Sequence, residues 1–314
     1  TKGSNTLRPE MTSEFEVGMN LQFFNGRFGI DAAYYNRKTK DQIFTLPTDP
    51  STGFSYMVTN FGEVSNKGIE LVINTTPIQI KDFRWDLSFN FSKNNNKVLS
   101  LPESLEGGKV SIYDFSAGND AIYMYAEEGK PMGQFYTYLP KKTADGKPIV
   151  DANGYPVLAT SVEDTGKNMN HDWTGGINTA FTYKDFSLYF LIDGKIGGNV
   201  ASQTQSYLDA YGVTEATADA RDDGGVDLGN GQKMDAQTFY TSTAGKEGAK
   251  DLYVYSATNF RLRELSLGYT FRNLLGASKN LNLSFVARNL FFIYKDAPTD
   301  PDMSVSTNNG WKGF

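Results

Sequence analysis

Eight segments of the chain alternate between apolar and polar side chains with a period of two residues, and this pattern limits the fold more than any other feature. The first segment sets Phe15, Val17 and Met19 against Glu14, Glu16 and other polar residues. Seven further segments follow the same rule, near 27–35, 68–75, 85–92, 174–183, 186–193, 264–271 and 281–288. Successive side chains of a β-strand point to opposite faces. The pattern therefore predicts an all-β protein whose long strands each have one apolar and one polar face.

The apolar face of these segments carries no charged side chain. Across about 34 positions it holds no Asp, Glu, Lys or Arg, whereas random placement at 21% charged residues would put roughly seven there. Such a face suits either the core of a soluble β-sandwich or contact with lipid. Alternation by itself therefore leaves both architectures open.

The connections between the segments favour one of these architectures. Short links at Asn25-Gly26, 77–82, Lys184-Asp185 and 272–280 alternate strictly with long links at 45–62, 98–172 and 198–255. Outer-membrane barrels have short periplasmic turns and long extracellular loops, and a sandwich has no reason to sort its loops in this way. Asn25-Gly26 is also typical of a two-residue hairpin turn. We therefore predict an antiparallel transmembrane β-barrel, here a partial one of about eight spanning strands with long extracellular loops, whose strands at 27–44 and 256–271 project beyond the membrane.

Composition narrows the possible functions. No stretch of 18 apolar residues occurs in the 314-residue chain, so no transmembrane helix is expected. The absence of cysteine excludes disulfides, zinc–thiolate sites and cysteine nucleophiles. The net charge of −6 disfavours nucleic acid as a partner, because neutralising phosphates requires a basic face.

Sequence motifs for catalysis, metals and cofactors are weak. His171 is the only histidine, and no nucleophile-elbow motif accompanies it, so we expect a solvated loop residue and no catalytic site. The acidic stretch 219–227 offers oxygen ligands that calcium prefers, but its spacing does not match an EF-hand, so a solvated loop is expected there as well. The roughly helical spacing of Val200, Tyr207 and Leu208 predicts a short helix within residues 199–211, whose plainer role is to pack the loop. We expect no metal and no cofactor.

Tyrosines in the long 98–172 link are the candidate substrate-binding residues. Exposed aromatic rings can stack on sugars or peptides, and they can equally form the core of a loop or a partner interface. The candidates are Tyr113, Tyr123, Tyr125, Tyr136 and Tyr138. A row of polar residues on the inward face is expected to line the lumen, where its plainer role is solvation: Glu14, Glu16, Asp31, Glu70, Asp86, Asp193, Glu264 and Arg288.

Five stretches resemble the SusC/RagA family of TonB-linked (TonB-dependent) outer-membrane transporters. Residues 7–18 read LRPEMTSEFEVG, residues 31–41 read DAAYYNRKTKD, and residues 60–70 read NFGEVSNKGIE, which is the most specific match. Residues 260–269 (FRLRELSLGY) and 287–291 (ARNLF) are similar to two further strands of that family. The matching stretches are spread over nearly the whole chain.

The resemblance implies a bacterial outer-membrane importer whose barrel has about 22 strands and a plugged lumen. It implies active, TonB-dependent uptake of an oligomeric nutrient, a glycan or a peptide, together with a SusD-like surface lipoprotein. We expect residues 1–314 to be a fragment of a single barrel domain, without the plug, the TonB-contacting segment and the last strand. The protein is not expected to be an enzyme.

Two other classes of function stay open at the level of sequence. A surface-exposed β-sandwich used for binding or adhesion would show the same alternation. A surface carbohydrate hydrolase would need a pair of carboxylates about 5–10 Å apart across a cleft, and a sequence does not reveal such a pairing.

Overall fold

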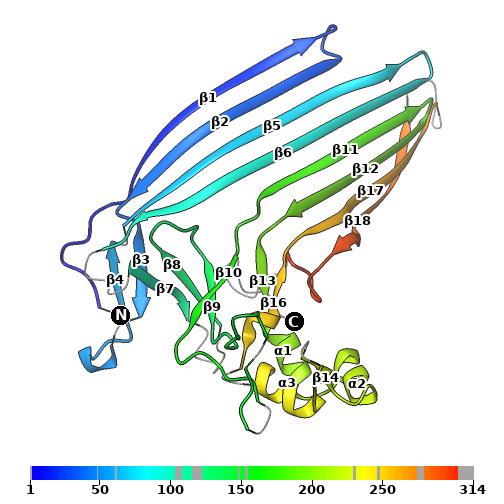
Figure 1. Ribbon diagram of the computed structural model, residues 1–314. Coiled ribbons are helices and arrows are strands. Elements are labelled where there is room, and N and C mark those ends of the chain that lie inside the picture. Colours follow the sequence, from blue (N-terminus) through cyan, green and yellow to red (C-terminus); the bar gives the residue numbers. More distant parts are fainter. Residues whose placement is uncertain are drawn as a thin grey trace.

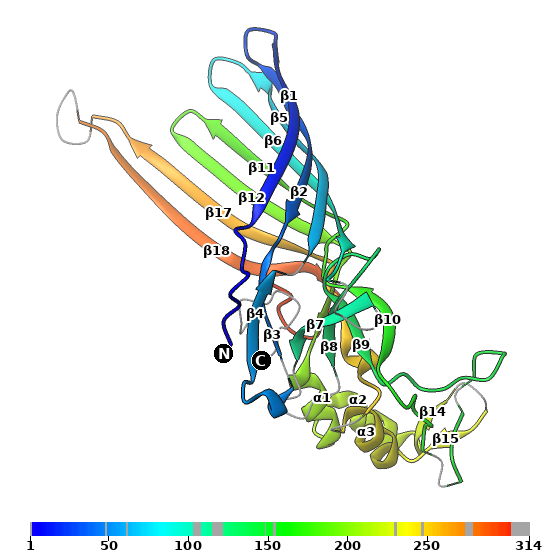
Figure 2. The same cartoon turned by 90° about the vertical axis from the view of Figure 1, so that its left-hand side faces the viewer.

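The long strands form one antiparallel sheet that curves like part of a barrel wall (Figure 1 and Figure 2). The computed structural model describes residues 2–302 except 48, 61, 103–107, 115–121, 148, 153–154, 229–230, 246–247 and 274–278. The spatial order of the strands follows their order along the chain, so that each strand pairs with the preceding long strand. The strands are β1 (Met11–Phe23), β2 (Phe28–Lys40), β5 (Glu63–Gln79), β6 (Phe83–Ser100), β11 (Trp173–Tyr183), β12 (Phe186–Ile196), β17 (Asn259–Phe271) and β18 (Leu281–Lys295).

Strand register gathers the apolar residues onto one face of this sheet. Residues that pair across neighbouring strands point to the same face. One row of such pairs crosses six strands through Leu21, Ile30, Ile73, Phe89, Ile177 and Ile192. The partial barrel that the alternation and the links predict is therefore confirmed.

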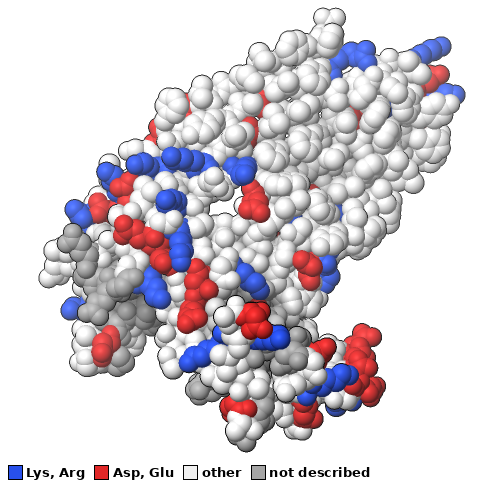
Figure 3. All heavy atoms as spheres, in the orientation of Figure 1, with Lys and Arg blue, Asp and Glu red and all other residues white. Residues whose placement is uncertain are grey.

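The apolar face is exposed rather than covered. Phe15 on β1 and Phe285 on β18 are 64% and 69% exposed. Figure 3 shows a broad strand surface almost without charged atoms, whereas Lys, Arg, Asp and Glu gather over the loops and at the ends of the strands. A soluble sandwich would bury this face under a second sheet. The sandwich alternative is therefore wrong, and the face has the character that contact with lipid requires.

The sorting of short and long links is also confirmed. The four short links lie at one end of the sheet, which we call the turn end, and the long links lie at the other, the loop end (Figure 1). The two-residue turn predicted at 184–185 is correct, because residues 183 and 186 pair. The turn predicted at Asn25-Gly26 is four residues long instead, since Phe23 pairs with Phe28. Residues 24, 25 and 26 all have positive φ angles, and three successive left-handed residues make a wider turn than Asn-Gly alone favours.

The strands that project furthest toward the loop end differ from those predicted. The expected strand 27–44 ends at Lys40, where Asp41 has a φ of 54°, and the chain then starts a separate short strand. The expected strand 256–271 begins only at Asn259. β5 and β6 are the longest strands, with 17 and 18 residues, and exceed the roughly 9–11 needed to span a membrane.

The long links fold into a compact loop module at the loop end (Figure 2). Its strands are β3 (Ile43–Pro47), β4 (Tyr56–Asn60), β7 (Lys109–Asp114), β8 (Tyr123–Glu127), β9 (Gln134–Thr137), β10 (Glu163–Asn168), β13 (Asn199–Ala201), β14 (Val226–Asp227), β15 (Lys233–Met234) and β16 (Val254–Ser256). Its helices are α1 (Gln203–Ala210), α2 (Glu215–Asp222) and α3 (Ala236–Ala244), with 3₁₀ turns η1 (Pro50–Thr52) and η4 (Lys250–Tyr253). None of the helices among the described residues has the length and apolar character needed to cross a membrane.

A small core joins the two longest links within this module. Ile122, Met124 and Phe135 come from the 98–172 link, and Ala201 and Val254 come from the 198–255 link. All five are at most 3% exposed. The module is therefore held together by burial between links that are far apart in the sequence, in addition to the strand pairing within each.

Candidate functional site

The face of the sheet opposite the apolar one carries the predicted polar row, and its charges are arranged in pairs. Arg37 on β2 donates to both carboxylate oxygens of Glu14 on β1, at 2.9 and 3.0 Å. Arg288 on β18 donates to Glu264 on β17 at 2.9 Å. Arg263 on β17 bonds Asp193 on β12. Because these pairs join neighbouring strands, they stabilise the sheet in addition to making this face polar.

A polar hollow lies in this wall near the loop end. It has a volume of about 410 Å³ and is lined by Glu14, Glu16, Ala33, Tyr35, Arg37, Asn66, Glu70 and Asn94. Tyr35 donates its hydroxyl hydrogen to Asn94 Oδ1 at 3.1 Å, and Asn94 donates to Asn66 Oδ1 at 3.0 Å. The ring of Tyr35 lies over Gly68, where an added Cβ would come within 2.4 Å of it. The asparagines were not predicted as site residues, although the run 94–96 inside a strand was a signal for them.

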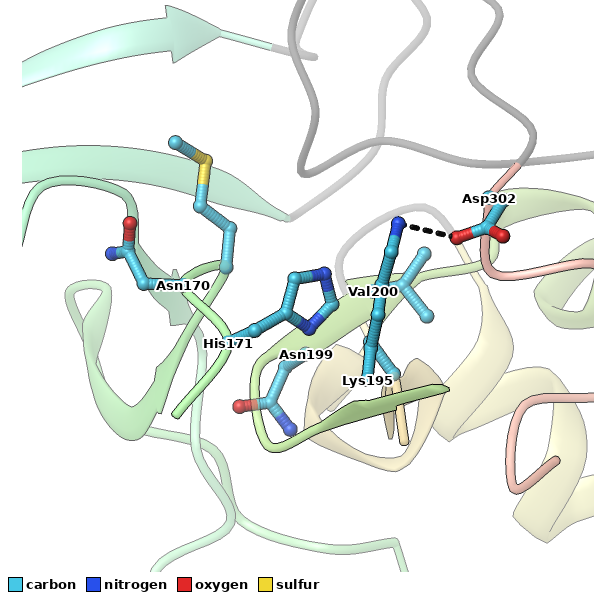
Figure 4. Close-up of a pocket in the computed structure, with 8 residues that line it drawn as sticks. Asn170, His171, Lys195, Asn199, Val200 and Asp302 are labelled. Carbon is cyan, nitrogen blue, oxygen red and sulfur yellow. Dashed lines mark hydrogen bonds and ion pairs between the residues drawn. The ribbon is translucent and has the colours of Figure 1, made fainter. Parts of the chain in front are cut away.

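A second cavity lies where the strands enter the loop module, and we call it the mouth cavity (Figure 4). Its volume is about 320 Å³. The lining consists of Met169, Asn170, His171, Lys195, Asn199, Val200, Ala257 and Asp302. His171 and Lys195 extend toward the same space, and Lys195 reaches Asp302 across it (Figure 4). Amides, an ammonium, a carboxylate and an imidazole are groups that bind polar ligands by hydrogen bonds.

The mouth cavity is closed on one side by the segment that follows β18. Asp302 accepts from Lys195 Nζ at 2.7 Å and forms an ion pair with Arg263 at 3.1 Å. Asp300 pairs with Arg261 at 2.6 Å, and the Arg261 side chain is only 7% exposed. These contacts join residues 39 to 107 positions apart along the chain. The sequence did not predict these ion pairs of Asp300 and Asp302, because only the fold brings the partners together.

His171 is not the fully solvated loop residue that was expected. Its side chain is half-buried, and Nδ1 lies 2.9 Å from the carbonyl oxygen of Gly197. Gly198 packs against it, since a Cβ there would lie 3.0 Å from the ring nitrogen. The close approach of the 197–198 turn, which needs two glycines at positive φ, explains the burial.

The predicted tyrosines divide between a stacked group and its surroundings. Tyr123 and Tyr125 on β8 and Tyr136 on β9 lie together, with the rings of Tyr125 and Tyr136 4.6 Å apart. Tyr136 is 3% exposed, while Tyr123, Tyr125 and Tyr138 are half-buried. The side chain of Tyr113 lies outside the described residues. Burial places Tyr136 within the loop core, which was the second interpretation of this cluster.

A charge network holds the stacked tyrosines in place. Tyr136 donates its hydroxyl hydrogen to Glu127, and Lys130 bonds both Glu127 and Asp164 at 2.8 Å. Burial alone would raise the pKa of Glu127, but the hydrogen bonds from Lys130 and Tyr136 outweigh it and lower that pKa. The hydrogen bonds that Lys130 donates to Asp164 and Glu127 raise its pKa. Lys109 lies over the ring of Tyr136 at 4.6 Å, a cation–π contact.

The acidic stretch 219–227 is mostly exposed to solvent, as predicted, but it is only partly a loop. Its first four residues complete α2, whose N-cap Thr214 and residue Thr217 form a reciprocal capping box. The two reciprocal hydrogen bonds of this capping box favour the start of a helix despite the loop-like composition. Within the described part of the chain, no group of three or more His, Cys, Asp or Glu side chains is placed to hold a metal ion.

The helix predicted at 199–211 is shorter than expected. Residues 199–201 pair with β16 as a strand, and α1 begins only after Ser202, whose side chain accepts from the backbone N–H of Gln205. An N-cap serine fixes the start of a helix at the following residue.

Comparison with known proteins agrees with this architecture. Residues 1–290 match the model of the family described as TonB dependent receptor-like, beta-barrel. The TonB-dependent receptor SusC of Bacteroides thetaiotaomicron is 30% identical over 85% of this chain and 27% of its own length. The TonB-dependent receptor P3 of Formosa agariphila is 26% identical over 98% of this chain and 32% of its own length. The chain thus spans about a third of the length of these relatives.

Among solved structures, the RagAB peptide transporter has the same fold. It superposes with a TM-score of 0.68 at 22% identity, and the match covers 91% of this chain and 32% of that one. The names of these relatives are those of receptors and transporters rather than enzymes. On the match over residues 1–290, the chain belongs to the TonB-dependent receptor β-barrel family, in its SusC/RagA branch, and its strands form part of a wall in the bacterial outer membrane.

Proposed function

We propose that the full-length protein is an active importer that moves an oligomeric nutrient, a glycan or a peptide, across the outer membrane. The observation that carries this proposal is the difference between the two faces of the eight-stranded sheet. An uncharged outer face meets lipid, and the opposite face offers paired charges and a polar hollow of about 410 Å³. A hydrated wall of this kind serves a lumen through which polar solutes pass. Residues 1–314 are, on this proposal, one stretch of a single barrel domain.

The proposed energy source is TonB, and the proposed partner is a SusD-like surface lipoprotein that covers the extracellular mouth. Both come from membership in the family. With short turns toward the periplasm and long loops toward the medium, the loop module and the mouth cavity lie on the outer side, where a lid and an arriving substrate would meet them. The SusC and RagAB relatives support this arrangement.

The stacked tyrosines are proposed to support substrate contact at the module. Tyr123, Tyr125 and Tyr138 keep part of their surface accessible, whereas Tyr136 and its hydrogen bond to Glu127 fix the position of the Tyr125 ring. A rigid aromatic surface presents a large contact area at a small cost in conformational entropy. Tyr113 stays a candidate from the sequence.

Uptake in whole cells tests the proposal. A strain lacking the gene for the full-length receptor should lose growth on, and accumulation of, one class of oligomer, a glycan or a peptide. Complementation should restore uptake, and deletion of tonB should abolish it again. A monosaccharide or single amino acid serves as the control, because small solutes cross general porins. Oligomer uptake that persists without TonB would contradict the importer function.

A further inference from the structure

The three helices at the tip of the loop module enclose a cavity that the import pathway described above does not use. We call it the helix cavity. Its volume is about 310 Å³, and its lining comes from the end of α1, from α2 and from α3. The helices lie at the end of the molecule furthest from the short turns (Figure 1). On the membrane orientation of the family, the helix cavity therefore faces the external medium.

Two tyrosines give the helix cavity its aromatic surface. Tyr211 follows α1 and is 81% exposed, and Tyr240 from α3 stands on the cavity wall with its hydroxyl 3.4 Å from the carbonyl oxygen of Ala216. The neighbouring Leu208 and Val213 are 41% and 67% exposed and are not among the lining residues. A large, solvent-facing ring beside a concavity offers an apolar face to a ligand that enters it.

A positioned guanidinium supplies polar recognition. Arg221 on α2 donates from Nη1 to the carbonyl oxygen of Gly212 at 3.0 Å. Gly212 has a φ of 69°, and a Cβ there would lie 3.1 Å from that same nitrogen. The glycine therefore admits the close approach that fixes the head of Arg221 at the cavity. An arginine has five N–H donors, so one bond leaves others for a ligand.

Further hydrogen-bonding groups face the same space. Gln237 lines the cavity, and no hydrogen bond to its side-chain amide is present among the described residues. Below it, the buried carboxylate of Asp209 accepts from Gln205 at 2.9 Å and Thr214 at 2.8 Å, which makes the floor rigid. Neutral polyols are bound by this combination of an aromatic face with planar amide and guanidinium groups, since sugars expose both C–H faces and hydroxyls.

The surrounding charge argues against an anionic ligand. Asp219, Asp222 and Asp223 lie on or directly after α2, beside Arg221. Figure 3 shows acidic side chains gathered at this tip with only a few basic ones among them. A sulfated or uronic-acid chain would be repelled at short range. An uncharged ligand of one or two sugar rings fits both the volume and the charge.

We propose that the helix cavity captures a neutral oligosaccharide at the cell surface, ahead of its entry into the barrel. This inference rests on the proposed import function and specifies its substrate class. It places Tyr211 as the stacking surface and Arg221 and Gln237 as hydroxyl ligands.

The test uses the purified full-length receptor in detergent and an array of neutral oligosaccharides, with uncharged Gly/Ser/Ala peptides as the second class of probe. The wild type should bind at least one neutral glycan. Tyr211→Ala and Gln237→Ala should each weaken that binding at least tenfold by calorimetry. Leu208→Ser is the matched control, because it changes an exposed apolar residue of α1 that does not line the cavity, and it should bind within twofold of wild type.

The outcomes separate this inference from the import function. A wild type that binds no neutral glycan, or binds only the peptides, overturns the inference, as do cavity variants that bind like wild type. In cells, the variants should reduce uptake at low oligosaccharide concentration and leave uptake at saturation unchanged. If TonB-dependent uptake is present but insensitive to the variants, the inference fails and the import function stands. If uptake is absent in wild type as well, the import function itself fails.

Discussion

Two adjacent residues of β18 should lose very different amounts of stability on the same substitution. Phe285 lies on the apolar face, is 69% exposed and pairs with Leu267. Its neighbour Ser284 points to the polar face, where it pairs with Gly268, a residue without a side chain. We therefore compare Phe285→Arg with Ser284→Arg, two changes at nearly the same depth that differ in the face they alter.

The depth of Phe285 sets the size of the effect. The strand begins at Leu281, four residues earlier. At about 3.4 Å per residue this is about 14 Å along the strand, and at a tilt of about 40° it is roughly 10 Å along the membrane normal. An apolar band about 25 Å tall then places Phe285 near the midplane, where an arginine on the lipid face costs about 2–4 kcal/mol. Ser284→Arg should cost less than about 1 kcal/mol, because the guanidinium stays in water and Gly268 leaves room for it.

The assay is equilibrium unfolding of the full-length receptor in phospholipid vesicles with urea, followed by tryptophan fluorescence. A loss of about 2–4 kcal/mol corresponds to a 30-fold to 1,000-fold change in the unfolding constant, well above the error of the extrapolation. The fraction of heat-modifiable receptor in outer-membrane preparations should fall in the same order. Equal losses for the two variants, or a larger loss for Ser284→Arg, would refute the assignment of the two faces.

Three further predictions concern other parts of the chain. Gly68→Ala should lower the free energy of unfolding by about 1–3 kcal/mol in the same assay, because the added Cβ would lie 2.6 Å from the backbone oxygen of Lys93 on the adjacent strand. An unchanged unfolding midpoint would contradict the packing described for the polar hollow. Lys250→Met should remove the two hydrogen bonds that the ammonium donates, to Ser206 Oγ and to the Ala244 carbonyl oxygen, in a site where Lys250 is 1% exposed, and leave only the bond from Ser206 to that carbonyl. Hydrogen exchange in α1 and α3 should therefore accelerate, while that in β11 and β12 stays constant. The lowered pKa of Glu127 stabilises the module above the pKa of the unfolded state, and this contribution is lost as the pH falls through the folded pKa. The protection factors of amides in β8 and β9, which correct for the intrinsic pH dependence of exchange, should therefore be constant between pH 6 and 8 and fall below about pH 4.5. Protection factors that stay unchanged down to pH 3 would exclude the Glu127–Lys130 bond as a stabilising contact.

The tyrosines of the loop module show how burial distinguishes residues that composition alone does not. The tyrosines of the 98–172 link looked alike in the sequence, yet Tyr136 is enclosed while Tyr123 and Tyr125 keep accessible surface. The difference arises because β9 is covered on both faces. Phe135 packs in a core shared with Ala201 and Val254 of another link, and the adjacent Tyr136 packs against Tyr125 and hydrogen-bonds to Glu127. No local pattern encodes a core whose two halves lie about a hundred residues apart.

The sequence by itself determined which strands form the sheet and which face of each strand is apolar. The tertiary structure decided the cavities and ion pairs at the loop end. Period-two alternation is a local property of β-strands, so the assignment of Leu21 and Ile30 to the lipid face followed from the chain alone. Link lengths then set the direction of the barrel, since hairpin turns need few residues. Asp302 forms ion pairs with Lys195 and Arg263, and these pairs join segments that are distant in the sequence. The cavities beside them depend on the same kind of contact. Such contacts form only after the strands have brought the segments together, and therefore leave no periodic signature in the sequence.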